Sequence, residues 1–143
     1  MNSREAFDRD ASKFIIALDF DGTLVDRGAF PGIGEDLGSK SYLLELQNRG
    51  AEFILFTLRD GQMLLDAISY MQIELDLDNF YLNSYPPATD WTISVKPFYT
   101  VLVDDRSLGV PLRTGRSGKP AVDWEKAGPM LLSLMDEWDQ NDG

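Results

Sequence analysis

Three mostly apolar runs are spaced along the chain, and each one ends at a polar side chain. They are residues 14–18 before Asp19, residues 53–56 before Thr57, and residues 99–103 before Asp104. Short runs of this kind, bounded by charged or turn-forming residues, are typical of strands buried on both faces of a parallel sheet. We therefore predict three strands whose carboxyl ends carry polar side chains.

Segments with apolar residues at helical spacing lie between and after these runs. They are residues 42–46, ended by Gly50, residues 62–71, and a last helix that opens at residues 123–125 and reaches Trp138. Pro129 lies in the first turns of that last helix, so we expect regular helix only from there. A short strand is expected at residues 80–82. Strands alternating with helices predict an α/β fold with a doubly wound, mostly parallel sheet.

Size and composition limit the organisation of the chain. Its 143 residues, of which 43% are hydrophobic and 11% aromatic, suffice for one domain with a proper core. We expect residues 14–143 to form that domain and the polar residues 1–13 to be a flexible N-terminal arm. No apolar stretch approaches the roughly 20 residues that span a bilayer. The first residues lack a signal-peptide pattern, which predicts a cytoplasmic protein without a membrane partner.

Charge and the absent residue types limit the chemistry. The net charge of −11 argues against general nucleic-acid binding. The chain has no Cys and no His, so thiolate ligands, imidazole ligands and a His general base are excluded. Hydrolysis would rest on carboxylates, hydroxyls, Lys or Arg, with an oxygen-preferring ion if a metal is used. A metal ion or a few local cations can still attract a phosphorylated substrate.

The first strand ends in the sequence Asp19-Phe20-Asp21-Gly22-Thr23-Leu24. Two acids one residue apart would emerge at the carboxyl edge of the sheet, where open α/β sheets bind ligands. Buried carboxylates are costly unless they are paired or bound to metal, so this pair calls for a cation. Taken alone, the hexapeptide also fits an ordinary surface loop.

These residues resemble DxDGT, the first motif of the haloacid dehalogenase (HAD) superfamily, most of whose members are Mg²⁺-dependent phosphatases or phosphotransferases. The later strand ends resemble the family's other motifs in order, namely Thr57 for the second, Lys96 for the third and Asp104-Asp105 for the fourth. Each alone is also explained as a strand-end or surface residue. Their order and their strand-end positions together favour the functional interpretation.

The chain looks most similar to small, capless HAD proteins. Two short sequence motifs of these proteins, one after the second strand and one after the fourth, appear here as residues 57–61 (Thr-Leu-Arg-Asp-Gly) and residues 104–109 (Asp-Asp-Arg-Ser-Leu-Gly). The segments between Thr23 and Phe53 and between Thr57 and Lys96 are too short for a globular cap. The resemblance thus implies an open cleft, which in this family accompanies bulky phosphoesters, unless an oligomeric neighbour covers it.

The resemblance also implies roles for the acids. Asp19 would attack phosphorus and form an aspartyl-phosphate, and Asp21 would carry the leaving group's proton. Mg²⁺ would be held by the Asp19 carboxylate, the Asp21 backbone carbonyl and the Asp104 carboxylate. Asp105 would hold a metal-bound water or orient Lys96.

Phosphate oxygens would be bound by Thr57, Lys96 and the backbone amides near Gly22. Arg59 and Arg106 could approach the substrate, or equally form surface ion pairs. Asn83, at the end of the third strand, could line the cleft or simply occupy a turn. Residues 112–120 are basic and glycine-rich, which predicts a hairpin or mobile loop and, as the less favoured alternative, contact with a polyanionic leaving group.

The sequence therefore predicts a Mg²⁺-dependent phosphomonoester hydrolase. A nucleotide or polynucleotide phosphatase is the alternative within enzymes. A catalytically silent HAD-like binding module is disfavoured because both acids of the first motif are intact. A CheY-like receiver domain also gathers acids, a Thr and a Lys, but it has no DxDGT. The sequence leaves substrate identity and oligomeric state open.

Overall fold

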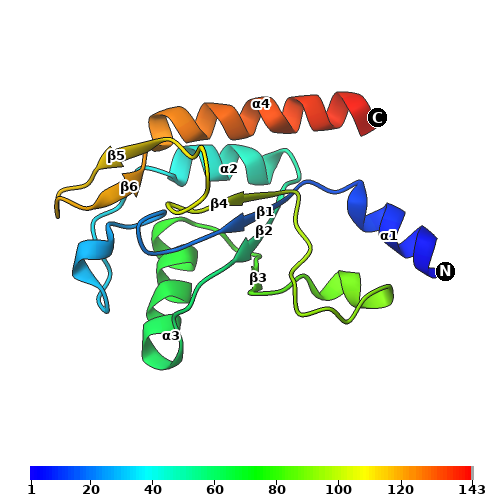
Figure 1. Ribbon diagram of the computed structural model, residues 1–143, viewed down its shortest axis with the longest axis horizontal. Coiled ribbons are helices and arrows are strands. Elements are labelled where there is room, and N and C mark those ends of the chain that lie inside the picture. Colours follow the sequence, from blue (N-terminus) through cyan, green and yellow to red (C-terminus); the bar gives the residue numbers. More distant parts are fainter. Residues whose placement is uncertain (143) are drawn as a thin grey trace.

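The computed structural model describes residues 1–142, with side chains described through Asp139, and it shows an α/β fold. Four parallel strands form the central sheet in the order β3-β2-β1-β4 (Figure 1). They are β1 (Ile15–Leu18), β2 (Glu52–Leu55), β3 (Tyr81–Leu82) and β4 (Val101–Val103). The predicted parallel α/β architecture is confirmed.

The described residues form four α-helices and three shorter helices, of which α2, α3 and α4 lie where the sequence pattern predicts helix. They are α1 (Ser3–Ala11), α2 (Lys40–Asn48), α3 (Gly61–Ser69) continued by a π-helix η2 (Tyr70–Glu74), and α4 (Trp124–Asp142), with 3₁₀ helices η1 (Arg27–Ala29) and η3 (Pro86–Asp90). Gly50 follows α2 with a φ of +98°, a backbone conformation that glycine adopts without strain. The sequence predicted regular helix only from Pro129 onward. In the structure α4 already begins at Trp124, and Pro129 lies inside it.

The two faces of the sheet are covered differently. Ile16, Leu18 and Phe53 share a core with buried residues of α2, α3 and α4. Ile15 and Ala17 point the other way and pack against η3 and aromatic residues of the segment leading to β4. The second face is thus covered by a 3₁₀ helix and an irregular segment, where double winding would place α-helices.

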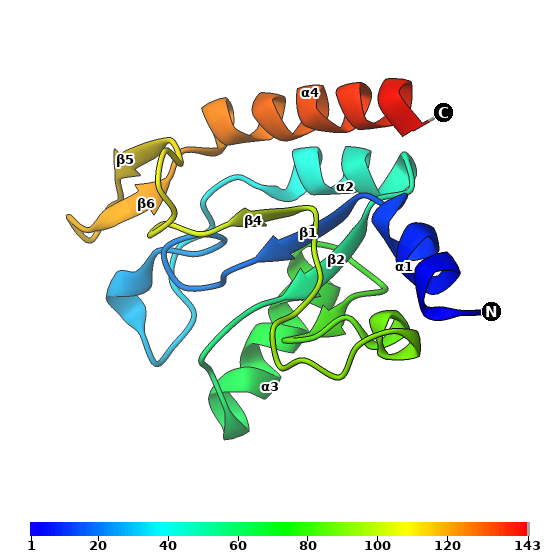
Figure 2. The same ribbon diagram turned by 45° about the vertical axis from the view of Figure 1, so that its right-hand side comes forward.

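Residues 1–13, expected to be a flexible arm, instead begin with α1. Asp10 of this helix is fully buried and accepts hydrogen bonds from Arg9 (2.9 and 3.0 Å) and from the Trp91 indole (2.9 Å). The helix lies against η3 at the amino end of the sheet (Figure 2). The sequence could not reveal this, because the burial of Asp10 depends on a partner 81 positions away.

Residues 112–120 contribute to a hairpin, as predicted. Its antiparallel strands are β5 (Leu112–Thr114) and β6 (Pro120–Val122), joined by a glycine-containing turn. Among the helices that the structure describes, none is long and apolar enough to cross a membrane.

The strand order identifies the ligand-binding edge of the sheet. The chain proceeds from β1 to β2 and β3 on one side, and then returns to β4 on the other side of β1. Leu18 is in register with both Leu55 and Val103, so the residues after these three strands lie at one level. Crevices at such a switch point, at the carboxyl ends of the strands, are where open α/β sheets bind ligands.

Candidate functional site

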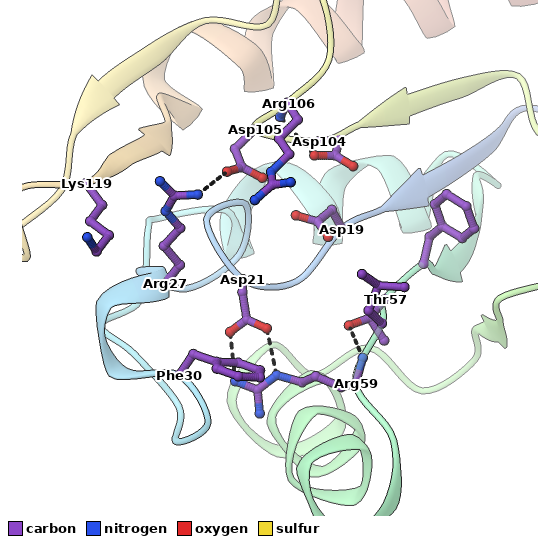
Figure 3. Close-up of a pocket in the computed structure, with 12 residues that line it drawn as sticks. Asp19, Asp21, Arg27, Phe30, Thr57, Arg59, Asp104, Asp105, Arg106 and Lys119 are labelled. Carbon is purple, nitrogen blue, oxygen red and sulfur yellow. Dashed lines mark hydrogen bonds and ion pairs between the residues drawn. The ribbon is translucent and has the colours of Figure 1, made fainter.

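Three carboxylates meet at this switch point. Asp19 follows β1, and Asp104 and Asp105 follow β4; one carboxylate oxygen from each lies within 4.8 Å of the others (Figure 3). The Asp19 backbone N–H donates to the Val103 carbonyl at 3.0 Å, which continues the β1–β4 pairing into the cluster. The sequence correctly placed Asp19 and Asp104 together. It assigned Asp105 an indirect role, whereas its carboxylate lies in the cluster itself.

Buried Thr23 ties the cluster together. Its hydroxyl donates to Asp19 Oδ2 at 3.0 Å and accepts the Asp105 backbone N–H at 3.1 Å. The Thr23 carbonyl in turn accepts the indole N–H of buried Trp124 at 2.6 Å. One threonine therefore fixes the spacing between the acid after β1 and an acid after β4.

Gly22 allows the acids to approach each other. Its φ is +86°, and a Cβ at this position would lie 2.6 Å from Asp105 Oδ2. Its N–H, however, donates to the Val25 carbonyl at 2.7 Å. In this conformation the tight turn uses that donor itself, so the Gly22 N–H is not free to bind a phosphate oxygen.

The environment of the cluster opposes its negative charge. Burial, followed by the charge of Asp104 and the contact with Asp105, raises the pKa of Asp19 to about 8. Burial also raises the pKa of Asp105. An all-oxygen cluster that resists ionisation in the absence of a cation fits a hard divalent ion, whose charge would relieve this repulsion.

Asp21 is held apart from the cluster by Arg59. Both carboxylate oxygens of Asp21 accept hydrogen bonds from the Arg59 guanidinium, at 2.8 and 2.7 Å. The other guanidinium N–H groups donate to the carbonyls of Pro31, Gly32 and Met63 at 2.7–3.2 Å. All five donors of an arginine are thereby occupied. Arg59, with a side chain only 1% exposed, neither offers a donor to substrate nor forms a surface ion pair, which corrects both alternatives.

Thr57 lies on the wall of the same cleft, as predicted. Its hydroxyl oxygen accepts the Arg59 backbone N–H at 3.1 Å, which leaves the hydroxyl proton for a ligand. Its backbone N–H donates to Asn83 Oδ1 at 2.8 Å. Asn83, with a φ of +54°, thus positions Thr57 from a turn and does not line the cleft.

Lys96 is not brought to the cleft, which corrects the prediction for the third motif. The side chain is exposed and lines a second pocket of about 270 Å³, between residues 84–89 and 92–98. The reason is topological. The Thr100 N–H donates to the Ile15 carbonyl, so the chain before β4 enters at the amino end of the sheet, opposite the acids.

Other cations line the cleft instead. It encloses about 560 Å³, and its lining includes Arg27, Arg106 and Lys119 together with Phe30, Phe56 and Leu58. Arg106 was among the candidates from the sequence, and Lys119 lies in the segment predicted to be a hairpin. Arg27 and Phe30 were missed; their only sequence signal is the Gly/Pro-bearing loop that follows the first motif.

Asp26, also missed, fastens that loop to the hairpin. It is 4% exposed and accepts hydrogen bonds from the Gly28 N–H (2.8 Å), the Ser117 hydroxyl (2.5 Å) and the Ser117 N–H (3.2 Å). The Ser117 hydroxyl is the main cause that lowers the pKa of Asp26. A Cβ on Gly115 would lie 2.3 Å from Asp26 Oδ2, so this turn requires glycine.

Comparison with known proteins supports the fold. No protein-family model matches the chain, and no curated protein matches it. Among solved structures, a conserved protein from Bacteroides thetaiotaomicron is similar, with a TM-score of 0.67 and 29% identity. The match covers 85% of this chain and 92% of that one. The chain thus shares its α/β architecture with a conserved bacterial protein.

Proposed function

We propose that the protein is a divalent-cation-dependent phosphomonoester hydrolase in which Asp19 is the nucleophile. The observation that carries the proposal is the cluster of Asp19, Asp104 and Asp105 at the switch point of a parallel sheet. Its motif order resembles that of HAD phosphatases. The connections after β1 and β2 contain only short elements, which supports a capless form.

Asp19, Asp104 and Asp105 are the side chains that would hold the ion, and Mg²⁺ is the ion that the resemblance implies. The resemblance adds the Asp21 carbonyl as a further ligand. A bound divalent cation would supply positive charge that offsets repulsion between these acids and a phosphate.

In the proposed reaction, an Asp19 carboxylate oxygen forms a bond to phosphorus while the bond from phosphorus to the leaving oxygen breaks. The leaving oxygen takes the electron pair and a proton. Water then attacks phosphorus, which releases inorganic phosphate and restores the Asp19 carboxylate. The Thr57 hydroxyl would donate to a phosphoryl oxygen.

Asp21 would carry the proton, and this role requires a movement. Both of its oxygens accept hydrogen bonds from Arg59 in the structure, so its carboxyl must turn away before it protonates a leaving group. Arg59 keeps three backbone carbonyl partners, which makes Asp21 the mobile member of the pair.

A phosphate-release assay with p-nitrophenyl phosphate tests the proposal. We expect turnover with Mg²⁺, none with chelator, and a loss of at least about 10⁴-fold in Asp19→Asn. Asp78→Asn, an exposed acid that does not line the cleft, is the matched control and should keep the parental rate. Parental turnover in Asp19→Asn would refute the covalent mechanism. Stable phosphorylation without steady phosphate release would instead favour a receiver-like function.

A further inference from the structure

One wall of the cleft is basic, although the chain carries a net charge of −11. This basic wall consists of Arg27 from η1, Arg106 from the loop after β4, and Lys119 from the hairpin. Figure 3 shows Arg27 and Lys119 on the Asp105 side of the carboxylate cluster and Arg106 between Asp105 and Asp104, with Asp21 and Arg59 below. Three cations from three chain segments therefore share one cleft with the proposed nucleophile.

These cations lack close acidic partners. Among residues 1–139, neither Arg106 nor Lys119 forms an ion pair, and Arg27 reaches Asp105 only at 4.0 Å. The Arg27 Nε is buried and has no hydrogen-bond partner among the described residues. Arg4, Arg9, Lys40, Arg49 and Arg116, elsewhere on the surface, each contact an acid. Lys13, Lys96, Arg113 and Lys126 also form no ion pair among residues 1–139, but none of them lines the cleft. The basic wall therefore supplies the positive charge inside the cleft that no close acid neutralises.

The basic wall is also held in place. Asp26 joins the loop that carries Arg27 to the hairpin that carries Lys119 through two hydrogen bonds from Ser117, and a third, from the Gly28 N–H, orders the loop itself. A Cβ on Gly28 would lie 2.2 Å from the Ser117 Cβ, so the two segments are in direct contact. The Val122 N–H donates to the Gly22 carbonyl at 2.9 Å, which fixes the hairpin to the first-motif turn as well. Such bracing reduces the ordering cost of binding.

We propose that the substrate is a small phosphomonoester whose leaving group carries a second anionic group, a phosphate or a carboxylate. This inference rests on the proposed function. The phosphoryl group to be transferred lies at Asp19, and the second anion lies against Arg27, Arg106 and Lys119. The cleft volume of about 560 Å³ is that of a small-molecule site. Phe30, 53% exposed, and Leu58, fully exposed, offer apolar surface to the body of such a substrate.

A polynucleotide substrate is disfavoured by the charge. Binding a nucleic-acid backbone needs many phosphate contacts from clustered Lys and Arg. The wall supplies three cations in a chain that has 24 acids and 13 bases. One or two localised anions match this number better than a long polyanion does.

The test compares substrates that differ in the second anion. With Mg²⁺ present, kcat/KM is measured for fructose 6-phosphate and fructose 1,6-bisphosphate, and for glycerol 3-phosphate and 3-phosphoglycerate. We expect at least about a tenfold preference for the member with the second anion, because a hydrogen bond to a charged group contributes roughly that factor. The two pairs distinguish a second phosphate from a second carboxylate. The preference should fall with added salt, since the wall is partly exposed.

Variants of the basic wall identify its contribution. In the double variant Arg106→Gln/Lys119→Gln, the preference ratio should fall to about one, through a higher KM for the doubly anionic substrate. Arg113→Gln removes one charge from the same hairpin at an exposed position outside the cleft, and it should leave the ratio unchanged. Calorimetric binding to Asp19→Asn should show the same preference without turnover.

Four outcomes would overturn the inference. Equal kcat/KM within both pairs, with turnover present, refutes it and leaves the proposed hydrolase intact. A preference that survives in the double variant shows that the wall does not bind the second anion. Better turnover of a 5′-phosphorylated oligonucleotide than of either doubly anionic substrate would assign the cleft to a macromolecule. Absence of turnover on every monoester refutes the proposed function and this inference together.

Discussion

Asp19 and Asp26 lie seven positions apart after the same strand, yet their surroundings differ completely. Asp26 accepts three hydrogen bonds from Gly28 and Ser117, and its pKa is lowered. Among the described residues, Asp19 accepts a side-chain hydrogen bond from Thr23 alone and faces two other acids, and its pKa is raised to about 8. A satisfied acid holds the architecture, whereas an unsatisfied acid costs stability and marks a place for a ligand.

Asp21 tests this comparison because it has the hydrogen bonds of a structural acid and the proposed role of a catalytic one. Its two oxygens are fully engaged by Arg59, as in a structural acid, yet the proposed mechanism needs it to carry a proton. Variants of these acids therefore distinguish a structural role from a catalytic or metal-binding one.

After the loss expected in Asp19→Asn, the largest expected effect concerns Asp21→Asn. General acid catalysis contributes roughly 10²–10⁴-fold, so this variant should lose more rate on an alkyl phosphate than on p-nitrophenyl phosphate, whose leaving group hardly needs a proton. The difference between the two losses should fall in that range. The measurement is kcat/KM on both substrates. Equal losses would place Asp21 with Asp26 as a structural acid.

The next effect concerns the stability contributed by the Arg59–Asp21 pair. Removing one member of a buried, hydrogen-bonded ion pair leaves an uncompensated charge, so Arg59→Met should lower the free energy of unfolding by about 3 kcal/mol. Urea denaturation measures this. Arg116→Met, which breaks the exposed pair with Glu35 (3.2 Å), should cost less than about 1 kcal/mol. Equal costs in the two variants would mean that Arg59 does not anchor the site.

Asp26→Asn and Asp19→Asn should change stability in opposite directions. Asn at position 26 would turn an amide donor toward the Ser117 donors, which should cost about 1–3 kcal/mol. Asn at position 19 removes a half-buried charge that faces Asp104 and Asp105, so without metal at pH 8 the variant should be more stable than the parent, by more than about 1 kcal/mol. Urea denaturation with chelator present compares them. Destabilisation by both would remove the distinction between the two acids.

The pH dependence of the parent follows from the same shifts. The pKa of Asp19 is raised in the folded protein, so its stabilising contribution is complete below about pH 4 and is lost as the pH rises toward about 8. The pKa of Asp26 is lowered, so its contribution is present above about pH 4 and is lost as the pH falls. We expect the parent, denatured without metal, to lose stability between about pH 4 and pH 8 because of Asp19. This loss should be absent from Asp19→Asn. A loss that persists in that variant would point to other acids.

The smallest effect separates the two acids after β4. The Asp105 carboxylate lies 4.0 Å from the Arg27 guanidinium, whereas Asp104 has no cationic partner among the described residues. Asp104→Ala should therefore weaken Mg²⁺ binding more than Asp105→Ala does, by roughly tenfold in Kd. Isothermal titration calorimetry gives both values. The reverse order would exchange their roles.

Hydrophobic periodicity and strand-end positions, which can be read from neighbouring residues, predicted part of the fold and part of the site. The strands β1 and β2 and the helices α2 and α3 followed from hydrophobic periodicity. Asp19 and Asp104 were found because both stand directly after a strand, and parallel strands bring such residues to one edge.

Tertiary contacts decided the rest. Lys96 stands near β4 in sequence but at the opposite end of the sheet, because the connection before β4 crosses the face of the sheet that the α2, α3 and α4 core does not cover. Arg59 could not be recognised as buried, since its partners at residues 21, 31 and 32 lie 27 to 38 positions away. Lys119 reaches the cleft only because Asp26 fastens the hairpin to the η1 loop.

The central claim is that the unsatisfied Asp19 forms a covalent bond to phosphorus. The direct measurement is a single turnover with a phosphomonoester and Mg²⁺, quenched in acid and treated with borohydride, which reduces an acyl phosphate on Asp to homoserine. Mass spectrometry then locates the change. The account predicts homoserine at position 19 and at no other position. Turnover with unmodified Asp19, or homoserine at Asp21, Asp104 or Asp105, would contradict it.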